Sequence, residues 1–195
     1  MAIASQRAGA GGWDVTEVYP VPGGITLTNP QHNYDAPPLG THQTDLSGNE
    51  FVLVDFGVNV PANGWQQGEF CTFILTTYAA ARMTASGRGF VGVVMSANIT
   101  STLRYGWVQV YGVNTFAWAN TSVTTAMGLT VPVTTDLGTI GASASTDVSV
   151  ALFGCLAVTD PNSCASTALG TSALAAPCTV ILNYPFITGQ FWVGS

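Results

Sequence analysis

The fold is decided by the stretch YGWVQVYGVNTFAWA at residues 105–119, where valine and aromatic residues make up the majority and charged residues are absent. Such side chains fit the pleated surface of a sheet, so the stretch predicts two successive strands, at 105–112 and 114–119. Runs of similar composition flank it on both sides. They predict further strands at 51–56, 69–78, 90–95, 129–135, 148–158 and 178–184.

Turn-forming sequences separate these predicted strands. PANG at 61–64 and DPNS at 160–163 combine proline, glycine, asparagine and aspartate, which are the residues that tight turns favour. Helix-forming segments are scarce, and 77–83 and 166–176 have room for only one or two helical turns each. Short strands with frequent turns are typical of all-β proteins, and we therefore predict a compact β-barrel or β-sandwich.

The first 48 residues have a different composition. They are rich in glycine, proline, asparagine and glutamine, which prevents long regular elements. They also carry aromatic side chains suited to lie on a protein surface. We therefore divide the chain into an extended, irregular N-terminal arm, 1–48, and a β-rich domain, 49–195. The arm residues that we predict to contact a neighbouring subunit are Trp13, Tyr19, Pro20, Pro22, Tyr34, Pro37 and Pro38.

Charge is the second distinctive property of the sequence. Only 7% of its 195 residues are charged, none is lysine, the net charge is -6 and the mean hydropathy is +0.36. An ordinary soluble domain has about 25% charged residues. So few charges give little repulsion between molecules, which predicts that neighbours cover much of the surface in a large assembly.

The same charge balance disfavours two classes of partner. Binding to nucleic acid or to an anionic membrane requires a basic patch, and this chain has only four arginines. No stretch reaches the roughly 20 apolar residues of a spanning helix. The start MAIASQRAGAGG lacks the basic and apolar regions of a signal peptide, so we expect no export.

The cysteines and histidines offer few ligands for a metal. Cys71, Cys155, Cys164 and Cys178 show no CxxC spacing, and we interpret them as small buried residues; a Cys155–Cys164 disulfide across a turn is the alternative. His32, Asp35, His42 and Asp45 repeat an H-x-x-D pattern, which zinc can use. Because they lie in the irregular arm, we interpret them as surface polar residues and expect no metal and no other cofactor.

Catalytic motifs are also missing. The sequence has no GxSxG nucleophile elbow, and GAGG at 9–12 neither follows a predicted strand nor opens a helix. Ten carboxylates are scattered along the chain, most of them beside predicted turns or strand ends. We therefore expect no enzymatic activity, with a glycosidase that uses two of these carboxylates as the alternative.

Aromatic side chains suggest a different alternative function. Tyr105, Trp107 and Tyr111 alternate along one face of the strand 105–112, and Val108 and Val110 share the other. If this face of the strand is exposed, the row of rings can stack on sugars. If the face is covered, the rings belong to a core with aromatic cross-strand pairs. We favour this second interpretation because an exposed tryptophan is costly on a surface with so few charges.

One longer stretch resembles a known family. RYGWVQVYGVNTFAWANTSVTTAMGLTVPVTTDLGTIGA at 104–142, and more loosely VSVALFGCLAV at 148–158 and ILNYPFITGQFW at 181–192, resemble segments of structural proteins of tailed bacteriophages. The similarity covers about the C-terminal half of the chain. Within these structural proteins, the chain resembles the head decoration, or cement, proteins in particular, which are small, β-rich and often trimeric.

The resemblance implies a function in the virion. The expected partners are the major capsid protein and further copies of this chain, in a homotrimer on the outer surface of the capsid. The protein would stabilise contacts between capsid subunits, with the arm reaching across a subunit boundary. The alternative is a carbohydrate-binding or host-recognition module of a phage fibre. A major capsid protein is disfavoured because the chain is short and no long helix is visible.

Overall fold

The computed structural model describes residues 13–20, 37–57, 64–84, 88–96, 99–120, 130–132, 140, 151–158, 167–169 and 173–187. These residues contain strands and no helix, which confirms the predicted all-β class. All strand pairings are antiparallel and belong to one sheet. The strands are β1 (Val18–Pro20), β2 (His42–Thr44), β3 (Glu50–Asp55), β4 (Phe70–Phe73), β5 (Ala80–Arg82), β6 (Gly89–Val94), β7 (Leu103–Asn120), β8 (Thr130–Pro132), β9 (Ala151–Ala157), β10 (Thr167–Leu169) and β11 (Ala173–Ile187).

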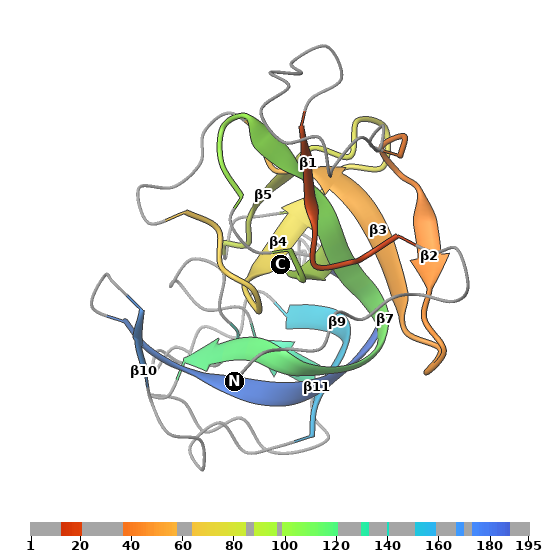
Figure 1. The fold of residues 1–195 in the computed structure, drawn as a ribbon. Coiled ribbons are helices and arrows are strands. Elements are labelled where there is room, and N and C mark those ends of the chain that lie inside the picture. The colour runs from red at the N-terminus through yellow and green to blue at the C-terminus, as the bar shows by residue number, and fades with distance from the viewer. Residues whose placement is uncertain are drawn as a thin grey trace, which may run out of the picture.

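The sheet has two halves that share the long strand β7. In the first half, residues 105–111 of β7 pair with β3, and β6, β4 and β5 continue the sheet on the other side. In the second half, residues 111–120 of β7 pair with β11, and β9 and β8 follow. Figure 1 shows β7 descending through the molecule, turning at one side and running back beneath the first half.

A buried polar network holds the bend in β7. Gly112 has a φ of 96°, a left-handed conformation that residues with a side chain rarely adopt. The Gln109 side-chain amide donates to the carbonyls of Tyr111 and Val113, both at 3.1 Å, and accepts from Asn114 at 2.9 Å. Because Gln109 and Asn114 are almost completely buried, their satisfied hydrogen bonds fix the bend. The two predicted strands 105–112 and 114–119 are therefore one strand with a corner.

Side chains of the first half-sheet are buried on both faces. Phe51, Leu53 and Trp107 lie on one face, beneath the segment that contains Val15 and Tyr19. Val52, Val54, Val108 and Val110 pack on the other face with Phe56 and Trp65. A third cluster joins the two halves, because it combines residues of β4 and β6 with residues of β7, β9 and β11. The covered sheet favoured from the sequence is confirmed for Trp107, Val108 and Val110.

The described parts of the N-terminal arm lie on this same sheet. β1 pairs with residues 103–106 of β7, and Tyr19 is buried with its ring 5.8 Å from that of Trp13. The Ser96 hydroxyl donates to the Glu17 carbonyl at 2.7 Å and accepts from the Trp107 amide at 2.8 Å. Residues 13–19 thus cover their own domain. The division of the chain at residue 48 stays a prediction.

Three local predictions from the sequence differ from the structure. The strand predicted at 69–78 ends at Phe73, where the chain turns and the Tyr78 amide donates to the Ile74 carbonyl at 2.6 Å. The helical turns considered at 77–83 are replaced by β5, which pairs with β4. Pairing with a neighbouring strand outweighs the local helix preference of three successive alanines. The helical turns considered at 166–176 are likewise replaced, in the described residues, by β10 and the start of β11.

Candidate functional site

A buried ion pair is the strongest polar feature of the first half-sheet. Arg82 contacts the Glu69 carboxylate twice, at 2.7 Å and 3.1 Å, and also donates to the Gly64 carbonyl at 2.7 Å. Its guanidinium lies 5.6 Å from the centre of the Trp65 ring. Burial raises the pKa of Glu69, and the neighbouring Arg82 opposes that shift. Arg82 therefore fastens the segment 64–69 to β5, which is a structural role.

The H-x-x-D segment does not assemble into a metal site within the described residues. His42 is exposed in β2, and Asp45 accepts hydrogen bonds from the Ser47 amide at 2.8 Å and the Asn49 amide at 2.9 Å. Asp45 thus shapes the turn between β2 and β3. The described part of the chain holds no group of three or more possible metal ligands. His32 and Asp35 lie outside the described residues.

The cysteines that the structure describes are buried in the core. Cys71 and Cys155 are buried, unbridged thiols, which confirms for these two the interpretation as small buried residues. The alternative prediction, a Cys155–Cys164 disulfide, is wrong because Cys155 is a free thiol. Burial raises the pKa of both thiols, so they stay protonated at neutral pH. Cys178 lies in the same core cluster as Cys155, and Cys164 lies outside the described residues.

The aromatic row on β7 is divided by the bend. The Trp107 side chain is fully buried, so no sugar can stack on it in this fold. Tyr105 is half-buried, and Tyr111, which follows the buried residues, is 40% exposed. The row of rings considered for glycan binding therefore does not form one continuous exposed surface. Its last residue, Tyr111, belongs to a different exposed surface.

That other surface is an apolar band on the outward face of the second half-sheet, and Phe90 of β6 extends it onto the first half-sheet. Ile181 of β11 is the direct cross-strand partner of Val113 in β7 and of Leu156 in β9. Phe186 is in the same way the partner of Phe153 in β9 and of Phe90 in β6. We define the apolar band as Phe90, Tyr111, Val113, Phe153, Leu156, Ile181, Tyr184 and Phe186, whose exposed fractions run from 38% to 52%.

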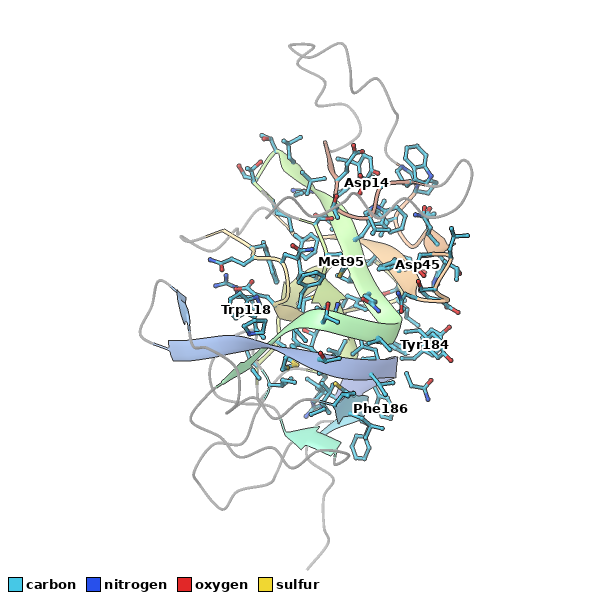
Figure 2. All side chains as sticks on the ribbon, turned by 60° about the horizontal axis from the view of Figure 1, so that its bottom comes forward. Asp14, Asp45, Met95, Trp118, Tyr184 and Phe186 are labelled. Atoms are coloured by element: carbon cyan, nitrogen blue, oxygen red, sulfur yellow. The ribbon has the colours of Figure 1, made fainter. Side chains whose placement is uncertain are left out.

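Ring contacts join two pairs of residues within the apolar band. The rings of Phe153 and Phe186 stack with their centres 5.4 Å apart, and those of Tyr111 and Tyr184 lie 5.5 Å apart. The Tyr184 hydroxyl donates to the carboxylate of Glu50, the first residue of β3. Figure 2 labels Tyr184 and Phe186 near one margin of the molecule, beside one end of the β11 ribbon.

The size of the apolar band sets it apart from scattered surface residues. Taking about 200 Å² for each large apolar side chain, the exposed fractions of the eight residues give about 700 Å² in total. The largest apolar patch of an ordinary monomer is about 300–600 Å² and is often functional. A patch that slightly exceeds this range, on a chain with 7% charged residues, makes this face the candidate functional site.

Sequence reasoning missed the apolar band and placed the contact residues in the arm. The structure buries Tyr19 and Pro37, leaves Pro38 exposed, half-buries Trp13 and places Pro20 in β1. Pro22 and Tyr34 lie outside the described residues, and arm contacts with a neighbour stay a prediction. The pattern that could have revealed the apolar band is in β11, where Val180 and Leu182 point inward and Ile181 points outward. A strand that is apolar on both faces needs a cover on both.

No helix within the described residues is long and apolar enough to cross a membrane. Comparisons with protein families, with curated proteins and with solved structures found no match to this chain.

Proposed function

We propose that this protein is a structural subunit of a large assembly and that it docks onto neighbouring protein subunits through the apolar band. The observation that carries the proposal is the band itself, eight large apolar side chains on one outward face of a chain with very few charges. Covering such a face with protein removes its apolar surface from water, which is the main driving force of association. Because hydrogen-bonded strands carry the band, its backbone also loses little conformational freedom on docking.

The proposed assembly is the capsid of a tailed bacteriophage. The support is the resemblance of residues 104–142 to phage structural proteins, together with the charge-poor composition. In this proposal the protein decorates the outer surface of the capsid and cements contacts between major capsid subunits. It acts as a homo-oligomer, a trimer, because several linked copies convert modest single contacts into tight attachment.

The expected effect of Ile181→Asp tests the docking surface. Ile181 lies in the middle of the apolar band between Val113 and Leu156, and its side chain is 42% exposed. A carboxylate there would be buried without a partner on docking, which disfavours the complex strongly. We expect the variant to fold normally and to lose at least about 90% of its co-sedimentation with empty phage heads, equivalent to about 1.4 kcal/mol or more.

Leu103→Asp is the matched control. Leu103 is 39% exposed at the start of β7, in the first half-sheet and outside the apolar band. The control variant should co-sediment as the wild type does. Equal loss in both variants would show a general effect of an added charge, and normal binding of Ile181→Asp would reject the band as the docking surface. Light scattering on the purified chain measures the proposed trimer directly, and a monomer at all concentrations would reject it.

A further inference from the structure

Glu50 is a charged side chain in contact with the apolar band. It begins β3 opposite Tyr111, is half-buried, and accepts the Tyr184 hydroxyl hydrogen bond. The ion pairs that the structure shows within the described residues join Arg82 to Glu69 and Arg104 to Asp55, and neither involves Glu50. The band therefore ends at a carboxylate whose charge no described cation balances.

Docking through the apolar band would remove water from this carboxylate. A buried carboxylate without a positive partner is unfavourable, and a hydrogen bond from one tyrosine replaces only part of its lost hydration. A partner that covers the band must therefore bring a cation to Glu50. This step rests on the docking surface proposed above.

The surroundings of Glu50 favour the guanidinium group over an ammonium. The faces of Tyr111 and Tyr184 carry the negative side of the ring quadrupole, and both residues are at least 40% exposed. A planar guanidinium can lie over a tyrosine ring and still donate two hydrogen bonds to one carboxylate, whereas an ammonium is a strongly hydrated point charge. We propose that Tyr111, Tyr184 and Glu50 form a binding site for an arginine side chain of the partner protein.

The site is built before the partner arrives. Tyr184 has a φ of 46°, a strained conformation for a tyrosine that persists only where its surroundings enforce it. The hydrogen bond to Glu50 and the contact with the Tyr111 ring hold the side chain in place. The two rings are in contact and tilted by 35°, so the guanidinium lies over their exposed faces and does not insert between them. A fixed platform lowers the ordering cost of binding.

The experiment is a titration of the full chain, labelled with ¹³C in its tyrosine rings, with N-acetyl-arginine amide, followed by nuclear magnetic resonance. We expect saturable shifts of the Tyr111 and Tyr184 ring signals in the millimolar range, as befits a single side-chain contact. N-acetyl-citrulline amide, the neutral analogue of the same shape, carries no charge to pair with the Glu50 carboxylate. It should therefore bind at least about tenfold more weakly, which corresponds to about 1.4 kcal/mol.

Glu50→Gln and Glu17→Gln separate the local charge from the net charge. Glutamine at 50 keeps an oxygen that accepts from Tyr184 and removes the carboxylate, and we expect about tenfold weaker binding of the arginine probe. Glu17 precedes β1 on the first half-sheet, so its substitution changes the net charge equally and should leave the titration unchanged. Unaltered ring signals of the free Glu50→Gln variant verify that the platform is intact.

Three results would overturn the inference. These are the absence of shifts with the arginine probe, equal binding of the citrulline probe, and unchanged binding by Glu50→Gln. Shifts with a neutral oligosaccharide and none with arginine would assign the platform to sugars and overturn it as well. None of these results depends on phage heads, so failure here with normal co-sedimentation of the wild type rejects the arginine site and leaves the docking surface standing.

Discussion

Arg82→Met is expected to lower the free energy of unfolding by about 3–5 kcal/mol at pH 7, the usual cost of removing one partner of a buried ion pair. The Glu69 side chain is only 6% exposed, and in the wild type Arg82 contacts both of its carboxylate oxygens. Methionine fills much of the same volume but leaves the carboxylate without its cation. Urea unfolding of both proteins, followed by tryptophan fluorescence, measures the difference.

The loss should depend on pH in a defined direction. Burial raises the pKa of Glu69 in the folded protein, and Arg82 lowers it. Without Arg82 that pKa rises further, so the folded variant binds a proton at a higher pH than the wild type does. A raised carboxyl pKa gives stability that is present at low pH and is lost as the pH rises through the folded value. The difference between variant and wild type should therefore shrink on acidification.

A double variant identifies the cause. In Glu69→Gln/Arg82→Met both charges are gone, and we expect recovery of at least about half of the loss, because uncharged replacements of a buried pair are often nearly neutral. A double variant no more stable than Arg82→Met would locate the damage in the packing against Trp65. A pH-independent loss would contradict the electrostatic explanation.

Gly112→Ala is expected to destabilise the protein by about 2–4 kcal/mol, through the combination of backbone strain and overpacking. Gly112 has a φ of 96°, and an added Cβ would collide with the Asn49 side chain and lie 3.0 Å from the Asn49 Cα. The Asn49 amide oxygen accepts from the Val113 amide at 3.0 Å. The new methyl group would therefore displace a hydrogen bond at the corner of β7, and thermal unfolding is the measurement.

Gly48→Ala is the matched control for the backbone contribution. Gly48 has a φ of 83°, and an added Cβ would meet nothing within 4 Å. Its substitution should therefore cost only the strain, about 1 kcal/mol. If the two variants lost equal stability, the collision of the added methyl group with Asn49 would contribute nothing to the loss in Gly112→Ala.

Local composition was sufficient to predict the fold class but insufficient to predict how the strands are joined. Valine-rich and aromatic runs such as FVLVDF at 51–56 form strands wherever they pair, and β3 appears almost as predicted. The corner of β7 depends on Gln109, Asn114 and Asn49, and Asn49 is far from the bend in sequence. Hydrogen bonds between distant residues leave no periodic pattern.

The candidate site shows the same limit. Exposure of Phe90, Phe153 and Phe186 is decided by which strands become neighbours, since each of these residues would look like a core residue in its own strand. Trp107 shows the reverse, because residues 13–19 cover a ring that its strand alone would leave exposed. Whether an aromatic residue is available to a partner is thus a property of the assembled sheet.

The shared strand β7 also determines how cooperatively the protein unfolds. Because β7 crosses both half-sheets and one buried cluster combines side chains from the two, melting of either half would expose core side chains of the other. The protein should therefore unfold in a single cooperative step, and the β7 amides should exchange with deuterated solvent only through global opening. Its pairings with β1 and β11 connect positions far apart along the chain, so that folding, which must close those long loops first, should be slow.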